Sequence, residues 1–302
     1  MHKHKIIGLT VLLIAVLLAG CGQPAPSDAT DEKLHVTVSI VPQQYFVERI
    51  GGDHVAVNVM VEPGASPHSY EPKPEQMRAL SSAAAYFSIG VDFEKAWLDK
   101  IAAANPEMQM VDTIAAIERL PMDAHSHDED ADDAHAEAEG NLDPHVWTSP
   151  ELVKIQAQTI YETLATLDPE HQADYRTNLD AFLADINALE TDIRSALSGL
   201  EHTQFMVFHP AWGYFAHDFG LEQLPIEIGG QEPSAQELAQ LIEEAKTEEI
   251  RVIFAQPEFS TKAAETIARE IDGEVLLISP LAHDWLGNLQ QVADTFARVL
   301  GE

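Results

Sequence analysis

The chain has 302 residues, with 50 Asp and Glu against 17 Lys and Arg, so its formal net charge is −33 when the histidines are neutral. So acidic a surface repels the phosphate backbone of nucleic acids and attracts cations, which excludes nucleic-acid binding, although solubility alone also accounts for the charge. Without its N-terminal segment the chain keeps about 270 residues, which is more than one hydrophobic core usually holds and predicts two lobes.

Residues 1–20 predict a signal peptide that does not belong to the fold. A short basic region precedes an apolar run, residues 6–19, which is too short to span a membrane because a span needs about 20 residues. The run ends in Leu-Ala-Gly-Cys, which resembles the lipobox of bacterial lipoproteins, so Cys21 is the predicted site of acylation. The alternative is an ordinary signal peptide with an incidental cysteine. Residues 21–33 then form a tether rich in Pro, Ser, Ala and Asp, and the lone cysteine excludes an intrachain disulfide.

Short apolar runs alternate with helical patterns in the first part of the mature chain. The runs predict strands at 34–40, 55–61, 84–89 and 108–111, and the helical patterns cover 74–82 and 94–104. Such alternation is typical of a parallel sheet with helices on its faces. We therefore predict an N-terminal lobe over residues 34–167, which an acidic loop at 121–140 interrupts and a helix from Pro150 to about Leu167 completes.

The longest predicted element is a linking helix over residues 168–200. Asp168 is a good N-cap residue, and Pro169 suits the first helical position. The apolar stripe, at spacings of four and three, consists of Tyr175, Leu179, Phe182, Ile186, Leu189, Ile193, Leu197 and Leu200. At 1.5 Å per residue the stripe runs roughly 45 Å, so this helix is long enough to span both lobes.

The α/β pattern resumes in a predicted C-terminal lobe over residues 201–302. Strands are expected at 205–208, 225–228, 251–254 and 274–278, and helices at 234–247, 261–271 and 288–300. The predicted fold class is therefore α/β, with two lobes that each hold a mostly parallel sheet with flanking helices, joined by one long linking helix.

Three histidines lie in separate short motifs, Gly-Ala-Ser-Pro-His68, Asn-Leu-Asp-Pro-His145 and Phe-His209-Pro. Each follows a turn or the end of a predicted strand, where a rigid scaffold presents side chains to a ligand. Three neutral imidazoles at one point favour zinc over magnesium or calcium, which prefer oxygen ligands. Taken singly, each histidine is equally consistent with a hydrogen-bonded structural role. The remaining histidines are interpreted as surface or structural, for example His54, His171, His202 and His217.

Four stretches together resemble the zinc and manganese receptors, or solute-binding lipoproteins, of bacterial ABC importers. These stretches are residues 64–72, 143–150, 208–215 and 254–260. The resemblance implies that metal binds in a cleft, with His68 and His145 from the first lobe and His209 from the second. It further implies a monomer that works with an ABC importer permease and its ATPase. The protein would be extracytoplasmic and lipid-anchored to a membrane, either in a periplasm or at the outer face of the cell.

The resemblance also bears on which metal is bound. Manganese members of that family place a carboxylate at the third ligand position, whereas this chain has His209, and three nitrogen ligands favour zinc. The cofactor expected is therefore Zn2+, as a transported ligand. The family's fourth ligand is an aspartate before Pro-Leu, where this chain has Ser279, a poor zinc ligand. Water, or a nearby carboxylate such as Asp284, is expected to complete the tetrahedron.

The acidic loop at 121–140 has no Lys or Arg and cannot bury enough apolar surface to fold. Its histidines, His125, His127 and His135, lie where zinc members of the family carry a His-rich loop. They predict an auxiliary site for weak zinc capture, and the alternative is a solvated linker.

Other functional classes remain to be weighed against a receptor. Three histidines and a water also suit a zinc hydrolase, but the chain has no His-Glu-x-x-His motif, and no general base is evident beside the three histidines. A manganese or iron receptor and a metal-stabilised adhesin are further alternatives. We expect a receptor and not an enzyme.

Overall fold

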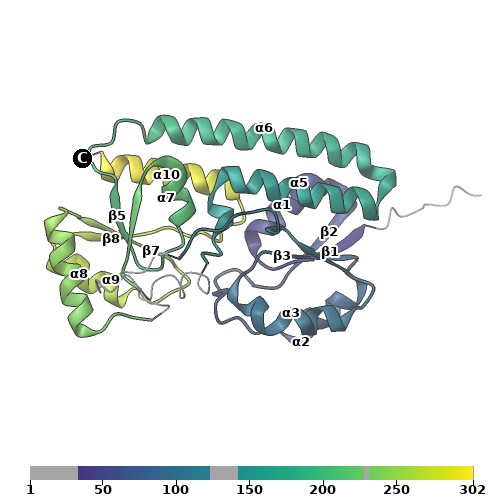
Figure 1. Ribbon diagram of the computed structural model, residues 1–302, viewed down its shortest axis with the longest axis horizontal. Helices are drawn as coiled ribbons and strands as arrows, with labels where there is room; N and C mark the ends of the chain where they lie inside the picture. The colour runs from purple at the N-terminus through teal and green to yellow at the C-terminus, as the bar shows by residue number, and fades with distance from the viewer. Residues whose placement is uncertain (1–32, 123–141, 228–230, 302) are drawn as a thin grey trace, which may run out of the picture. The chain divides into compact units, whose positions relative to one another are not determined.

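The N-terminal lobe is built on a four-stranded parallel sheet in the order β2-β1-β3-β4. The computed structural model describes residues 33–122, 142–227 and 231–301 (Figure 1). The elements of this lobe, in chain order, are β1 Leu34–Val38, α1 Val41–Gly51, β2 Val55–Val59, α2 Pro74–Ala79, β3 Ala85–Ser88, α3 Asp92–Ala104 and β4 Gln109–Asp112. β1 and β3 contribute mainly buried residues, as strands covered on both faces do.

Two long helices connect this sheet to the second lobe. They are α5 at Pro150–Leu167 and α6 at Gln172–Ala196, and a short 3-10 turn at Val146–Thr148 precedes them. The predicted linking helix is present, but it is shorter than residues 168–200, because Pro169–His171 form a separate 3-10 turn. Asp168 does not cap a backbone N–H with its side chain, because its carboxylate accepts hydrogen bonds from Tyr175 (2.6 Å) and His171 (2.7 Å).

The C-terminal lobe repeats the architecture with parallel strands in the order β6-β5-β7-β8. Its elements are β5 Gln204–Val207, α7 Gly213–Phe219, β6 Glu222–Pro225, α8 Ala235–Thr247, β7 Val252–Ala255, α9 Lys262–Glu270, β8 Glu274–Leu277 and α10 Trp285–Leu300. The predicted α/β class with two parallel sheets and a linking helix is confirmed, and most predicted boundaries lie within two residues of those observed.

Two predicted elements in this lobe are misplaced. The strand expected at 225–228 lies at Glu222–Pro225, because it begins with the polar pair Glu222 and Gln223 and is positioned by its pairing with β5. The last helix begins at Trp285 instead of Asn288. The reason is that the Asp284 carboxylate accepts a hydrogen bond from the Gly287 N–H at 3.2 Å and so caps the helix earlier.

One hydrophobic core runs through both lobes. Helix α6 packs against α1, α5 and α10, and its buried stripe is continuous with the apolar residues of the first sheet. Trp285 of α10 lies edge-on to Phe46 of α1, with ring centroids 5.2 Å apart. Figure 1 shows α6 lying along both lobes with α5 and α10 beneath it. Because the lobes share a core, large hinge motions between them are disfavoured.

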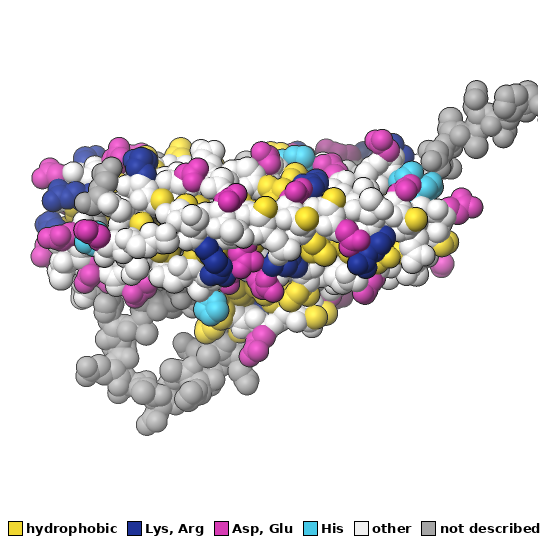
Figure 2. Space-filling view, turned by 90° about the horizontal axis from the view of Figure 1, so that it is seen from above, with side chains coloured by type: hydrophobic (Ala, Val, Ile, Leu, Met, Phe, Trp, Pro, Cys, Tyr) yellow, Lys and Arg dark blue, Asp and Glu magenta, His cyan; other side chains and the backbone are white. Residues whose placement is uncertain are grey.

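The face formed by α6 carries charges of both signs. Ion pairs on it include Arg176–Asp180, Arg194–Glu190 and Arg49–Asp185. Figure 2 looks onto this face and shows acidic side chains spread over it among Lys, Arg and apolar groups. Across residues 33–122, 142–227 and 231–301, no helix combines the length and the apolar character needed to cross a membrane.

Candidate metal centre

The three motif histidines occupy loops that face one another between the two sheets. His68 follows β2, and its N–H is 3.3 Å from the Ser66 hydroxyl. His145 directly precedes the 3-10 turn at Val146–Thr148. His209 follows β5 and is held by a pair of hydrogen bonds with Gln256, which accepts from the His209 N–H (3.2 Å) and donates to its carbonyl (2.7 Å). Loops beyond the carboxyl ends of parallel strands are where α/β sheets place ligands.

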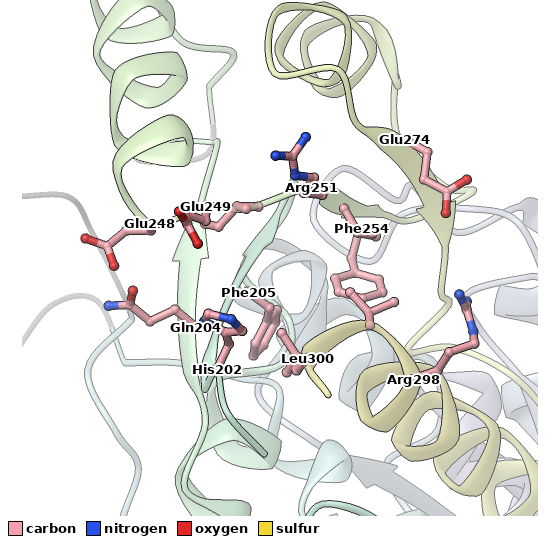
Figure 3. A pocket seen from close by; sticks show the side chains of 13 residues that line it. His202, Gln204, Phe205, Glu248, Glu249, Arg251, Phe254, Glu274, Arg298 and Leu300 are labelled. Carbon is pink, nitrogen blue, oxygen red and sulfur yellow. The ribbon is translucent and has the colours of Figure 1, made fainter. Parts of the chain in front are cut away.

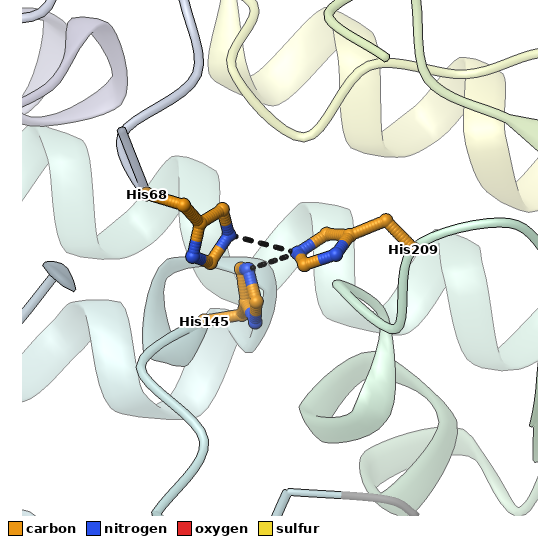
Figure 4. Close-up of side chains that lie close together, drawn as sticks. All are labelled: His68, His145 and His209. Atoms are coloured by element: carbon orange, nitrogen blue, oxygen red, sulfur yellow. Dashed lines mark hydrogen bonds between the residues drawn. The ribbon is translucent and has the colours of Figure 1, made fainter. Parts of the chain in front are cut away.

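The Nε2 atoms of these histidines converge on one point (Figure 4). The His209 Nε2 lies 2.9 Å from that of His68 and 3.2 Å from that of His145. Within the described part of the chain, these three residues form the one group of possible ligand atoms that all lie within 4.8 Å of one another. Nitrogens bound at 2.0–2.1 Å to one tetrahedral zinc are roughly 3.3 Å apart, so the spacing suits a single ion.

The second ring nitrogen of each histidine, Nδ1, is hydrogen-bonded to a carboxylate. The Nδ1 of His68 is 2.6 Å from Asp92, that of His145 is 2.7 Å from Asp143, and that of His209 bonds to Glu227. A carboxylate only accepts, so each Nδ1 carries the proton and each Nε2 lone pair is free for a metal.

Sequence reasoning missed these carboxylate partners. Asp143 stands two residues before His145 in the same motif, so its role as the partner of His145 could have been predicted from the sequence. Asp92 and Glu227 are 24 and 18 residues from their histidines, and only the fold brings them close. Glu227 reaches His209 because the chain continues along the sheet past Pro225, with the Glu227 N–H bonded to the Phe208 carbonyl at 2.9 Å.

The pKa values of the site residues favour the binding of a cation. Burial, together with the neighbouring His145 and His68, lowers the pKa of His209 to about 4, although Glu227 opposes this shift. His209 is therefore neutral near pH 7 and has its lone pair available. The hydrogen bond from His68 holds the pKa of Asp92 well below its usual range, so that this partner stays anionic.

A buried acid supports the loop that precedes Asp92. The Glu94 carboxylate accepts hydrogen bonds from the N–H groups of Ile89 (3.0 Å) and Gly90 (2.8 Å), and burial raises its pKa. The Phe93 N–H, next in the chain, donates to the Pro67 carbonyl at 3.1 Å. The first ligand loop is thereby tied to the start of α3.

The space enclosed by the histidines is very small. The pocket has about 10 Å³ of room and is lined by the three histidines together with Pro67, Val91, Trp147, Glu258, Phe259, Pro280 and Leu281. Phe259 stacks on the His209 ring, with centroids 4.6 Å apart. A cavity of 10–15 Å³ holds about one water-sized particle, so this pocket suits one ion and excludes an organic substrate.

The structure bears on the choice of a fourth ligand. Asp284 is exposed, caps α10 and does not line the pocket. Ser279 accepts from the Leu281 N–H (3.1 Å), and its hydroxyl donates to Glu258 at 2.7 Å. Glu258, which lies within the resembling stretch 254–260, is the carboxylate that lines the pocket without bonding to a histidine Nδ1.

A second hollow lies at the opposite edge of the C-terminal sheet, where β5, β7 and β8 begin (Figure 3). It has a volume of about 320 Å³ and an apolar floor that includes Phe205, Phe254 and Leu300. Its rim carries Arg251 and Glu274, so charges of opposite sign offset one another. None of the three convergent histidines lines it.

His54 and His171, which the sequence assigned to a surface or structural role, do not join the metal group. His54 is 3.0 Å from Asp174 and stacks on His171, in keeping with a surface or structural role. Cys21 and the loop histidines (His125, His127 and His135) lie outside the described residues.

Two parallel-sheet lobes that share a rigid helix, with three carboxylate-backed histidines between them, define a metal-binding receptor of the solute-binding class. The sequence matches, over residues 36–299, the family described as ZnuA, zinc-uptake complex component A periplasmic. The chain belongs to this family, as its resemblance to metal receptors of ABC importers predicted.

Individual relatives agree with this assignment. A putative metal-binding protein of Treponema pallidum is 30% identical over 267 residues, which cover 87% of this chain and 84% of that protein. The high-affinity zinc uptake system protein ZnuA of Bacillus subtilis is 29% identical over 285 residues, covering 92% and 89%. A crystal structure of a ZnuA deletion mutant with zinc bound is similar with a TM-score of 0.82 and 46% identity, covering 90% of this chain and 99% of its own.

Proposed function

We propose that this protein is an extracytoplasmic receptor that binds one Zn2+ through His68, His145 and His209 and delivers it to the permease of an ABC importer. The observation that carries the proposal is the convergence of three Nε2 atoms from both lobes on one point. Membership of a zinc-uptake family and a zinc-bound relative support it. Three nitrogens also suit zinc better than manganese, which favours oxygen ligands.

The geometry favours a receptor over a zinc hydrolase. A hydrolytic zinc needs room for a substrate beside its water, whereas this pocket holds about 10 Å³. Asp92, Asp143 and Glu227 are engaged with histidine Nδ1 atoms, so they are not free to act as a general base. The family is one of uptake components, which agrees with binding and release without turnover.

A ligand set split between the lobes lets the importer distinguish loaded from empty protein. His68 and His145 lie in the part of the chain before α6, and His209 lies after it. The Nε2 atoms already lie close together, so the binding energy of zinc would select this closed arrangement over one in which the lobes lie further apart. The shared core confines this change to the loops and to small lobe displacements.

Zinc titration of metal-free protein tests the proposal, with a competing chelator if binding is tight. We expect one tight zinc per chain, and weaker additional binding from the auxiliary loop. A variant lacking residues 122–140 is the control, and it should keep the tight site and lose the weak binding. Absence of a tight zinc in the full chain would contradict the receptor proposal, and loss of the tight site on loop deletion would contradict the auxiliary role.

We further propose that the receptor acts as a monomer, held at the membrane by acylated Cys21 and the tether at 21–33. The lipobox-like end of the signal segment supports this. We expect wild-type protein to fractionate with membranes. Cys21→Ala should shift it to the soluble fraction, and Cys21→Ala protein that stays with the membranes to the wild-type extent would rule out the anchor.

A further inference from the structure

One buried oxygen beside the histidines has no partner. The Oε2 atom of Glu258 is shielded from solvent and makes no hydrogen bond. Of the buried side-chain atoms left without a partner in the described residues, it is the one that belongs to a carboxylate, and Glu258 lines the histidine pocket. Burying an acceptor without a partner costs about 1–3 kcal/mol, and more for a charged group. A cation in the pocket would remove this cost.

The other oxygen of Glu258 is held in place. The Ser279 hydroxyl accepts from the Leu281 N–H at 3.1 Å, which directs its proton towards Glu258 Oε1 at 2.7 Å. This bond orients the carboxylate and leaves Oε2 as its free end. Ser279 thus acts on the site through Glu258 and needs no contact with the metal itself.

The loop that carries Glu258 is also coupled to a histidine ligand. Gln256, two residues earlier, makes both hydrogen bonds that fix the His209 backbone. Phe259, the next residue, stacks on the His209 ring at 4.6 Å and donates its N–H to the Gln256 carbonyl at 3.2 Å. A displacement of His209 on metal binding therefore reaches Glu258 through direct contacts.

We propose that Glu258 is the fourth zinc ligand and binds the ion through Oε2, giving a site of three nitrogens and one carboxylate oxygen. This deepens the proposed function and rests on it. The group of atoms within 4.8 Å of one another contains the histidines alone, so the carboxylate turns inward as the ion enters. Glutamate oxygens bind zinc at 2.0–2.2 Å, and the anion reduces the charge of the centre from +2 to +1.

Cobalt serves as a spectroscopic probe, because it takes zinc's tetrahedral geometry and its visible spectrum reports exchangeable ligands. With Glu258 bound, azide should leave the spectrum of the cobalt-loaded wild type unchanged. In Glu258→Gln water takes the open position, so azide should shift the spectrum. Loss of a partner that only hydrogen-bonds to a metal ligand lowers metal affinity by ~10–100-fold. Because Glu258 would contact the ion directly, zinc affinity of Glu258→Gln should fall by at least this much. Ser279→Ala keeps the carboxylate and should retain the azide-insensitive spectrum.

The matched control is Glu248→Gln, which removes one exposed charge of the same lobe beside the distant hollow. It should keep wild-type zinc affinity, and metal-free Glu258→Gln should melt as the wild type does. An azide-sensitive wild type, or unchanged zinc affinity in Glu258→Gln, would overturn the assignment and leave water as the fourth ligand. Failure of the wild type to bind zinc or cobalt at all would instead overturn the three-histidine site.

Discussion

Replacing His209 by alanine should weaken zinc binding by about 100- to 1000-fold. Structural zinc sites at neutral pH bind with ~10–16 kcal/mol shared among four ligands, so one ligand carries about 2.5–4 kcal/mol. Truncation also leaves Glu227 buried without its hydrogen-bond donor. His68→Ala and His145→Ala should have effects of the same order, because their Nε2 atoms meet that of His209 at 2.9 and 3.2 Å.

Competitive titration of metal-free protein measures this effect, and His202→Ala is the matched control. His202 is exposed and lines the distant hollow, so its loss should leave affinity unchanged. Zinc uptake by cells that lack the gene should be restored by wild type and by His202→Ala, but not by the three site variants. Wild-type affinity in any one of these variants would remove that histidine from the site.

Much of the fold could be predicted from the sequence because many strands and helices show their own local pattern of apolar residues. Leu34–Val38 alternates apolar and polar residues as strands do, and α6 has an apolar stripe at helical spacing, so both patterns could be recognised in the sequence. The strand at Glu222–Pro225 was misplaced because its first residues are polar and its pairing with β5 is a tertiary effect. The helix start at Gln172 was missed because Asp168 bonds to side chains and not to the backbone.

The site could be predicted only in part for a related reason. His68, His145 and His209 stand in local motifs, which sequence can display. Their partners Asp92 and Glu227 stand in no such motif and reach the histidines through sheet topology. For the fourth ligand the sequence left water and Asp284 open, and the Asp284 carboxylate caps α10 in the structure.

A tryptophan pair links the two lobes beside the metal pocket. The Nε1 of Trp147, which lines the pocket, donates to the Pro280 carbonyl at 2.8 Å. The Nε1 of Trp285 in turn donates to the Trp147 carbonyl at 2.7 Å. Both side chains are about 1% exposed, so these hydrogen bonds form inside the shared core. The pair therefore couples the position of the pocket wall to the packing of α10.

Trp285→Ala should lower the free energy of unfolding by about 3–5 kcal/mol, the usual cost of truncating a fully buried Trp or Phe. The loss combines the cavity left beside Phe46 and Phe182 with the lost hydrogen bond to Trp147. Urea unfolding of metal-free protein, followed by circular dichroism, measures it. Zinc affinity should fall less than in the histidine variants, because Trp285 touches the pocket only through Trp147.

Trp97→Ala is the matched control for this substitution. Trp97 is partly exposed on α3, with the Lys100 ammonium 4.0 Å from its ring centroid, so truncation there leaves no enclosed cavity. It should therefore cost clearly less stability than Trp285→Ala. Equal losses for the two variants would mean that Trp285 does not join the lobes in the way its contacts indicate. A Trp285→Phe variant, which keeps an aromatic ring, should recover most of the packing and lack only the hydrogen bond, worth about 1 kcal/mol.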